Sequence, residues 1–206
     1  MSREPENRRV LVIDDNPAIH DDFRKILATS TPNEEFQAAR AQLFESLDPP
    51  IPHHEFHIDC ADQGKEGFEM VQKAFRAGQP YAVAFVDMRM PPGWDGAETI
   101  EHIWESDPHI EIVICTAYSD HNWEHLLSRL AHHHKLLILK KPFDPIEVIQ
   151  LVTSLTERWN QQFHTQQQLE RLAAFQEEQA QEVQRVIREL EQEASHRAPN
   201  SSETYL

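Results

Sequence analysis

Three carboxylates, a hydroxyl and an ammonium group follow short apolar runs that lie far apart in the 206-residue sequence. Asp14 and Asp15 end the first run and Asp87 ends the third, whereas Thr116 ends the fourth and Lys141 follows the fifth. If these runs are parallel strands of one sheet, their carboxyl ends meet at one edge, where ligands bind beside the point at which the strand order reverses. We therefore expect the five side chains to converge there.

Three neighbouring anions repel one another by several kcal/mol at an intermediate dielectric, so such a cluster needs a cation. Mg2+ is the simplest candidate, because it prefers oxygen ligands and commonly combines one or two carboxylates with phosphate oxygens. A central carboxylate can attack phosphorus and form an aspartyl phosphate, while the metal and the ammonium group neutralise the transferring oxygens. Taken singly, each residue also has a structural explanation, such as helix capping or a surface charge. Their joint position at strand ends favours the chemical interpretation.

The apolar runs alternate with amphipathic segments, a pattern typical of a parallel sheet with helices on both faces. The predicted strands are residues 10–13, 56–58, 81–86, 110–115 and 136–139. The predicted helices are residues 17–29, 63–77, 95–106 and 121–131, with a fifth beginning after Pro145. With right-handed crossovers, this (βα)5 order predicts an α/β fold with a doubly wound, five-stranded parallel sheet.

Segment 31–55, between the first helix and the second strand, is too long for an ordinary connection in a compact domain. Its first part could form a helix, and it then breaks at the proline-rich residues 48–52. We interpret it as an insertion, and the sequence does not indicate its role.

No proline or glycine occurs between Pro145 and Pro199, which permits one helix of about 50 residues, roughly 75 Å long. Alternating steps of four and three residues from Val148 to Ala194 reach 14 positions, of which 11 are apolar and three are glutamine. This period is typical of a left-handed coiled coil. We expect a homodimer through residues 148–194, because the apolar stripe would otherwise be exposed to water. The alternatives are a solvated single helix and a disordered Gln-rich tail.

Five short motifs occur in the order found in a known family. They are Val12-Ile13-Asp14-Asp15, Phe85-Val86-Asp87-Met88-Arg89-Met90-Pro91, Asp95-Gly96, Cys115-Thr116-Ala117 and Lys141-Pro142-Phe143. Together they resemble the receiver domain of two-component response regulators over about residues 8–155. The resemblance implies a flavodoxin-like receiver fold and a phosphoacceptor rather than an enzyme, with at most slow autophosphorylation from small donors and autodephosphorylation. It also implies Mg2+ as the cofactor and a sensor histidine kinase or a phosphotransfer protein as the partner.

The resemblance assigns four metal-binding positions. It implies that Asp15 and Asp87 bind Mg2+ directly and that Asp14 acts largely through water. The main-chain carbonyl of Arg89, two residues after Asp87, is the fourth expected ligand.

The resemblance also assigns three catalytic positions. Asp87 corresponds to the phosphoacceptor, Thr116 to the hydroxyl that moves toward the phosphoryl group, and Lys141 to the lysine that pairs with it. Besides segment 31–55, which lies outside the usual pattern, two features depart from the family pattern. Loop 91–96 is one residue longer than usual, and Ile138 occupies a position that often carries a tyrosine or phenylalanine. We therefore expect signalling to use backbone or helix shifts rather than an aromatic side chain at position 138.

Composition excludes several classes of function. With 19 Lys and Arg against 35 Asp and Glu, the net charge is -16, which argues against direct binding to nucleic acid. No apolar run approaches the roughly 20 residues that cross a bilayer, and the first residues lack the apolar core of a signal peptide. We therefore expect a cytoplasmic protein without membrane insertion. Cys60 and Cys115 are expected to be reduced thiols in buried strands.

Three other features point weakly to different functions. Residues 195–199 faintly resemble the phosphorylated-histidine motif of sensor kinases, but no ATP-binding glycine boxes follow. Histidines at 53–57 and 132–134 could bind a transition metal, although exposed loop histidines explain them better. A phosphatase of the haloacid dehalogenase type requires a second aspartate where Arg89 stands.

We therefore expect a receiver domain at residues 1–155, a coiled-coil helix at 156–196 and a disordered tail at 197–206. The leading interpretation is a phosphoacceptor response regulator that signals through a dimerising C-terminal helix. The alternative is a receiver or connector module of a larger hybrid kinase or cyclic-dinucleotide signalling enzyme.

Overall fold

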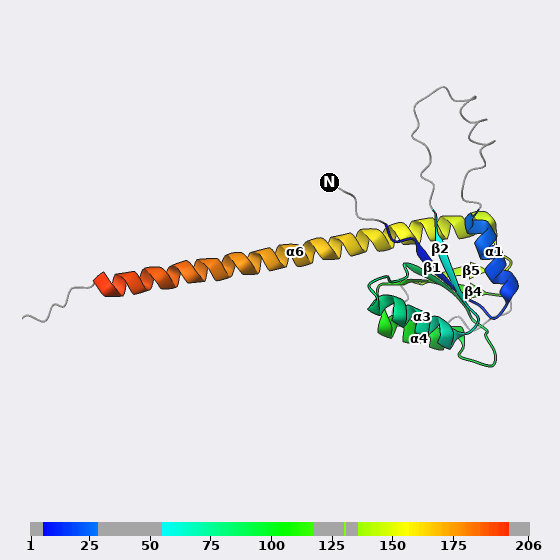
Figure 1. Ribbon diagram of the computed structural model, residues 1–206. Helices are drawn as coiled ribbons and strands as arrows, with labels where there is room; N and C mark the ends of the chain where they lie inside the picture. The colour runs from blue at the N-terminus through cyan, green and yellow to red at the C-terminus, as the bar shows by residue number, and fades with distance from the viewer. Residues whose placement is uncertain (1–5, 29–54, 118–129, 131–135, 198–206) are drawn as a thin grey trace, which may run out of the picture. The chain divides into compact units, whose positions relative to one another are not determined.

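A five-stranded parallel sheet forms the centre of the fold (Figure 1). The computed structural model describes residues 6–28, 55–117, 130 and 136–197. Its strands are β1 (Arg9–Ile13), β2 (His57–Ala61), β3 (Val83–Asp87), β4 (Glu111–Thr116) and β5 (Leu136–Lys140). Its helices are α1 (Pro17–Ala28), α3 (Gly64–Arg76), α4 (Gly96–Ser106) and α6 (Pro145–Arg197).

The strand order is β2-β1-β3-β4-β5. After β1 the chain adds β2 on one side, and it then adds β3, β4 and β5 on the other side, so the strand order reverses between β1 and β3. The register pairs Ile13 of β1 with Val86 of β3, which places the residues that follow these strands next to each other. This order confirms the predicted doubly wound α/β fold.

Helices cover both faces of the sheet (Figure 1). On one face, α3 and α4 pack against each other and against the central strands through Val71, Ile100 and Ile103. On the other face, α1 and the first part of α6 bury Phe23 and Val152. The middle strands β3 and β4 are buried along their whole length, as expected for continuous apolar runs covered on both sides.

Strand β2 differs from its prediction. It runs from His57 to Ala61 rather than over residues 56–58, and includes Asp59 and Cys60. Since β2 lies at the edge of the sheet, most of its side chains are exposed or half-buried, and its apolar pattern is correspondingly weak. Cys60 is therefore half-buried rather than part of the core. Cys115 is buried as expected, burial raises the pKa of its thiol, and both cysteines are free.

The first part of α6 belongs to the sheet domain. Val148, Val152, Leu155 and Trp159 are buried against the sheet, although they are the first members of the predicted coiled-coil stripe. The expected dimer contact over 148–194 is thus wrong at its start, because an intramolecular partner already covers those side chains. The chain divides into two compact units, Met1–Gln161 and Gln162–Leu206, a boundary beyond the predicted one at residue 155.

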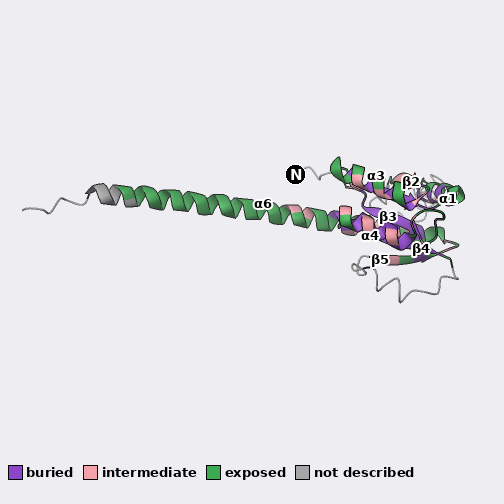
Figure 2. Ribbon diagram, turned by 90° about the horizontal axis from the view of Figure 1, so that it is seen from below, coloured by how far each residue is buried: buried purple, intermediate pink, exposed green. Residues whose placement is uncertain are grey.

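The second part of α6 has no buried side chain between residues 161 and 190, a change along the helix that Figure 2 shows in colour. Its exposed large apolar side chains are Phe163, Leu169, Leu172, Phe175, Val183, Val186, Ile187 and Leu190. Most of them follow the predicted heptad stripe or lie directly beside it.

Polar contacts fix α6 to the sheet domain before its exposed part begins. Arg158 donates from Nε to Glu111 Oε1 at 2.8 Å and from Nη2 to Glu111 Oε2, and Glu111 is completely buried at the start of β4. Asn160 Oδ1 accepts from Asn7 N at 2.8 Å, and Asn160 Nδ2 donates to Asn7 O at 2.9 Å. These contacts connect α6 with residues that precede β1 and begin β4.

Several predictions concern residues outside the described ranges. They are most of the 31–55 insertion, the helix at 121–131, the histidines at 132–134 and the tail from residue 198. Among the described helices, none has the length and apolar character to cross a membrane.

Candidate functional site

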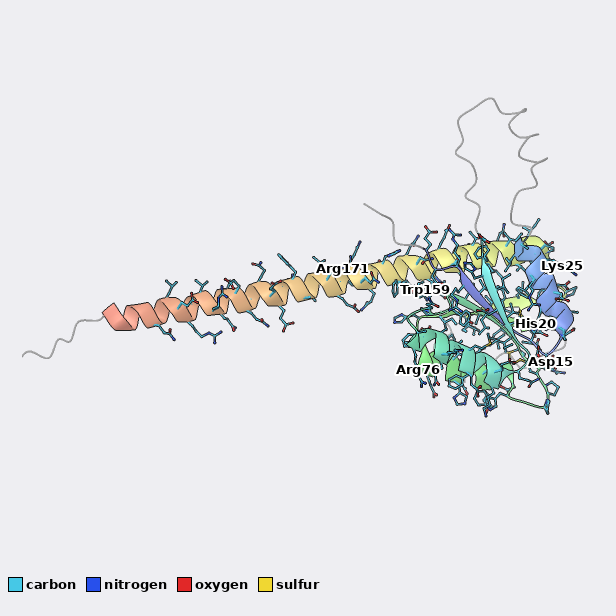
Figure 3. The ribbon with its side chains drawn as sticks, viewed as in Figure 1. Asp15, His20, Lys25, Arg76, Trp159 and Arg171 are labelled. Carbon is cyan, nitrogen blue, oxygen red and sulfur yellow. The ribbon has the colours of Figure 1, made fainter. Side chains whose placement is uncertain are left out.

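The acidic cluster lies at the carboxyl ends of β1 and β3. Asp14 directly follows β1, Asp15 lies in the turn before α1 (Figure 3), and Asp87 is the last residue of β3. One carboxylate oxygen from each residue lies within 4.8 Å of the others, with Asp14 and Asp87 buried and Asp15 exposed. The neighbouring strands β1 and β3 therefore bring together the three carboxylates that the sequence predicted to converge.

Lys141 supplies the positive charge of the cluster. Its Nζ donates to Asp14 Oδ2 at 2.6 Å and to Asp87 Oδ1 at 2.5 Å. Its backbone N donates to the carbonyl of Thr116 at 2.8 Å, which ties the ends of β4 and β5 together. The ammonium group thus bridges two carboxylates that come from different strands.

The protonation of Lys141 follows from these contacts. Burial by itself lowers the pKa of Lys141, but the hydrogen bonds and negative charges of Asp14 and Asp87 together raise the pKa above that of a free lysine. Lys141 is therefore charged throughout the physiological pH range, and it offsets part of the repulsion among the carboxylates.

Backbone N–H groups fix the second oxygen of each buried carboxylate. Arg89 N donates to Asp87 Oδ2 at 3.0 Å, and Asn16 N donates to Asp14 Oδ1 at 3.0 Å. Each carboxylate therefore has one oxygen on Lys141 and the other on the N–H two residues later. Sequence reasoning missed these two donors. The available signal was the tendency of aspartate to accept from the N–H two residues on.

Gly96 allows α4 to start directly beside β3. A Cβ at this position would lie 2.5 Å from the carbonyl oxygen of Asp87 and 2.9 Å from Met88 Cα, so only glycine fits. Asp95 caps the helix by accepting from Glu98 N at 2.8 Å. The Asp95-Gly96 motif thus fixes the chain immediately after the acidic cluster.

Thr116 is buried at the end of β4. Its Oγ1 donates to the carbonyl of Ala117 at 3.1 Å. The structure thus places Thr116 at the carboxyl end of β4, where it was expected. Its hydroxyl is hydrogen-bonded to the main chain of the next residue. Arg89, in the loop after Asp87, has an exposed side chain, which leaves its main chain as the part that faces the site.

The donor set of the acidic cluster fits Mg2+. All three candidate ligands are carboxylate oxygens, the ligand type that this hard cation prefers, and they come from two separate parts of the chain. The exposed position of Asp15 leaves the cluster open to solvent on one side, as required for an ion that keeps several waters.

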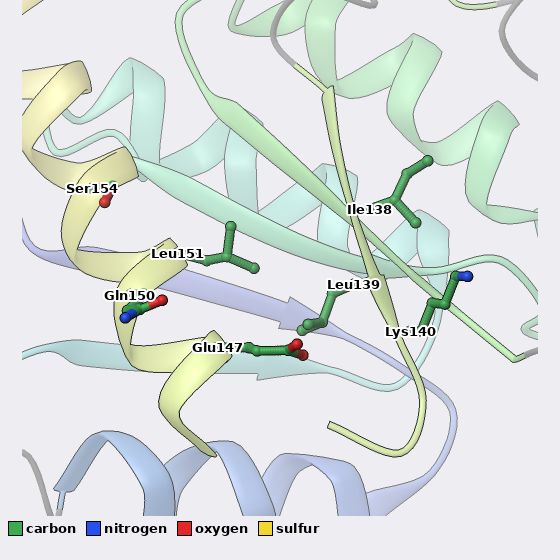
Figure 4. Close-up of a pocket in the computed structure, with 7 residues that line it drawn as sticks. All are labelled: Ile138, Leu139, Lys140, Glu147, Gln150, Leu151 and Ser154. Carbon is green, nitrogen blue, oxygen red and sulfur yellow. The ribbon is translucent and has the colours of Figure 1, made fainter. Parts of the chain in front are cut away.

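A separate depression lies between β5 and α6 (Figure 4). Its lining residues are Ile138, Leu139, Lys140, Glu147, Gln150, Leu151 and Ser154. None of them belongs to the acidic cluster. Ile138, the residue at the position often occupied by an aromatic side chain, is 43% exposed, and its side chain points away from α6 (Figure 4).

The family model of the response regulator receiver domain matches residues 34–153, which is more than half of the chain. The chain belongs to this receiver family. The match begins after Asp14 and Asp15, so the place of this acidic pair in the receiver rests on the geometry of β1 described above.

Solved structures agree with the receiver fold. The structure of an adenylate cyclase from Rhodopirellula baltica is 18% identical, with a TM-score of 0.59, and the alignment covers 80% of this chain and 98% of that one. The signal receiver domain of an HD domain-containing protein from Pseudomonas fluorescens Pf-5 is 13% identical, with a TM-score of 0.55 and coverages of 80% and 97%. A CheY-like receiver domain protein from Methanospirillum hungatei JF-1 is 22% identical, with a TM-score of 0.50 and coverages of 73% and 95%. At these identities the similarity establishes the fold alone. A search of curated proteins found no match.

The position of Lys141 in this receiver leads to a first prediction. Lys141→Ala removes a positive charge that competes with a bound cation for the oxygens of Asp14 and Asp87. We expect Mg2+ to bind about tenfold more tightly, which corresponds to ~1.4 kcal/mol. This is of the same order as the Coulomb energy of about 1 kcal/mol between unit charges roughly 4 Å apart in water. Isothermal titration calorimetry measures this change. Lys140→Ala, at the exposed neighbouring position, should leave the affinity unchanged, and weaker binding by Lys141→Ala would contradict the prediction.

Proposed function

We propose that this receiver acts in the cytoplasm and accepts a phosphoryl group on Asp87 from a sensor histidine kinase or a phosphotransfer protein. Asp14, Asp15, Asp87 and the carbonyl of Arg89 would hold Mg2+. The observation that carries the proposal is the bridge from Lys141 Nζ to Asp14 and Asp87, beside a third carboxylate. A structural salt bridge needs only one carboxylate, whereas three carboxylates around one lysine leave an excess of negative charge for a further cation.

In the transfer, a carboxylate oxygen of Asp87 forms a bond to phosphorus. The bond from phosphorus to the donor's imidazole nitrogen breaks, and the donor keeps that electron pair. Bound Mg2+ would neutralise charge on the transferring oxygens. The N–H of Arg89 holds Oδ2 of Asp87, which supports an orientation of the carboxylate for attack. Lys141 can exchange its contact with Asp87 for a phosphoryl oxygen without leaving Asp14.

The Thr116 hydroxyl would report this event. We propose that it gives up the carbonyl of Ala117 and donates to the phosphoryl group. The hydrogen bond from Lys141 N to the Thr116 carbonyl would pass a shift of β4 to β5 and to the start of α6. Since Ile138 is aliphatic, the change would travel through the backbone and helices.

The function is tested by incubation with acetyl phosphate. In the presence of Mg2+, intact-mass spectrometry should show one added phosphoryl group, and chelation of the metal should prevent its addition. An unmodified protein under both conditions would contradict the proposal.

We further propose that the exposed part of α6 forms a parallel two-stranded coiled coil with a second copy of the chain. Large apolar side chains such as Leu169, Val183 and Leu190 are between 55% and 59% exposed, and they share one stripe of the helix. Gln166 and Gln176 lie on the same stripe. In a parallel pair in register each glutamine meets its own copy and can form a hydrogen bond. The polar positions are therefore compatible with the parallel arrangement that we propose.

The coiled coil leads to a second prediction. In the variant Leu169→Glu with Ile187→Glu, burial of two large apolar side chains per helix is lost and replaced by like charges. Since each such side chain contributes roughly 1.5–3 kcal/mol, we expect a monomer at micromolar concentrations where the wild type is a dimer. Gln167→Glu with Gln181→Glu adds the same charge away from the stripe and should remain dimeric. Sedimentation velocity distinguishes these species, and a monomeric wild type would contradict the dimer.

A second candidate function is that of a receiver or connector module in a larger signalling enzyme. The continuation of α6 to Arg197 favours it, since a long helix suits the transfer of a signal to a further domain. Two of the similar structures also carry names of larger signalling proteins, an adenylate cyclase and an HD domain-containing protein. The genomic sequence after the codon for Leu206 tests this candidate. A kinase or cyclase domain encoded there or before the codon for Met1 would support it, and an open reading frame with neither would contradict it.

A further inference from the structure

Trp94 lies in the loop that leads from Asp87 to α4, and it belongs to a cluster of three aromatic rings. Its ring centroid is 4.5 Å from that of His102 on α4, with the ring planes 33° apart. It is 5.9 Å from the ring of Phe68 on α3, which in turn is 5.7 Å from His102. All three side chains are half-buried. The ring of one loop residue is therefore held between two helices.

The same loop also lies close to the start of α3. A Cβ at Gly64 would approach Trp94 Cβ to 3.3 Å, and a Cβ at Gly93 would lie 2.4 Å from Gln63 Oε1. Gly93 N donates to the carbonyl of Met90 at 3.1 Å, and Met90 is buried. The later half of the loop is thus fixed by packing against two helices.

The earlier half of the loop contacts the acidic cluster directly. Met88 N donates to the carbonyl of Cys115 at 3.2 Å, and Arg89 N holds Asp87 Oδ2 at 3.0 Å. The loop is one residue longer than is usual in the family, and an additional residue increases the conformational freedom that must be restricted. A contact in its later half therefore limits how far the main chain of Arg89 can move.

We infer that Trp94 is a positioning residue for the metal site. By stacking on His102 and Phe68, it holds the loop so that the main chain of Arg89, whose N–H donates to Asp87 Oδ2, keeps its place beside Asp87. This inference rests on the proposed function, because it concerns the same Mg2+ site. Trp94 touches neither the metal nor the phosphoryl group in this account and acts only through the loop.

The test measures Mg2+ affinity by calorimetry and the initial rate of phosphoryl incorporation as a function of Mg2+. We expect Trp94→Ala to raise the Kd for Mg2+ about three- to tenfold, the fold-change that corresponds to the energy of one aromatic pair. The rate at saturating Mg2+ should stay within about twofold of the wild type, because Asp87, Lys141 and Thr116 are untouched. Trp94→Phe should restore most of the affinity, since it keeps an aromatic ring.

Two further variants keep the test decisive. His102→Ala removes the stacking partner without changing the loop, and it should raise the Kd in the same direction even if Trp94→Ala fails to fold. Phe75→Ala removes an exposed aromatic ring elsewhere on α3 and should leave the Kd unchanged. Wild-type affinity in both Trp94→Ala and His102→Ala would overturn the inference. A wild type that binds no Mg2+ and accepts no phosphoryl group would instead overturn the proposed function.

Discussion

Asp87→Asn should abolish phosphoryl incorporation completely. The asparagine amide keeps the size of the side chain and an oxygen for Lys141, but it lacks the negative charge and the nucleophilic carboxylate oxygen. After incubation with acetyl phosphate and Mg2+, intact-mass spectrometry should show only the unmodified mass of this variant.

A matched control separates the role of Asp87 from a general effect of lost charge. Asp62 is exposed and lies outside the acidic cluster, so Asp62→Asn makes the same chemical change away from the site. We expect it to incorporate phosphoryl as the wild type does. Equal incorporation by Asp87→Asn and Asp62→Asn would show that another residue is the acceptor.

Arg158→Met should lower the free energy of unfolding by about 3–5 kcal/mol, the largest stability effect that we expect. Its guanidinium is the bidentate partner of Glu111, which is completely buried at the start of β4. Without Arg158, the carboxylate of Glu111 remains in the protein interior as an uncompensated charge. Urea denaturation measures the change as a lower midpoint.

Two other variants identify the cause of this loss. Arg185→Met removes an arginine from an exposed pair with Glu182 on the same helix and should cost less than about 1 kcal/mol. Glu111→Leu combined with Arg158→Met replaces the whole pair by apolar side chains and should recover most of the stability. If the double variant is no more stable than Arg158→Met, lost helix packing rather than the buried charge explains the effect.

The convergence of the site could be predicted because it depends only on strand ends and strand order. Asp14, Asp87 and Lys141 each stand at the end of an apolar run, and any doubly wound sheet brings such ends together. The orientation of the Thr116 hydroxyl could not be predicted, because it depends on a single rotatable bond and a local carbonyl. The N–H donors of Arg89 and Asn16 depend in the same way on the path of the turn.

The long helix shows a different limit of sequence reasoning. A 3.5-residue apolar stripe runs from Val148 to Ala194, and its period is the same whether a sheet or a second helix covers it. Only the packing of Val148 to Trp159 against the sheet shows where the intramolecular partner ends. The aromatic cluster around Trp94 was equally hidden, because Phe68 and His102 lie on separate helices at no characteristic spacing.

The most direct test of the central claim is chemical mapping of the phosphorylated residue. Borohydride reduces an acyl phosphate to an alcohol, so an aspartyl phosphate becomes homoserine at its position. After incubation with acetyl phosphate and Mg2+, reduction and peptide sequencing by mass spectrometry should find homoserine at position 87 and at no other aspartate. Homoserine at a different aspartate, or a phosphoryl group that survives on a serine or histidine, would contradict the account.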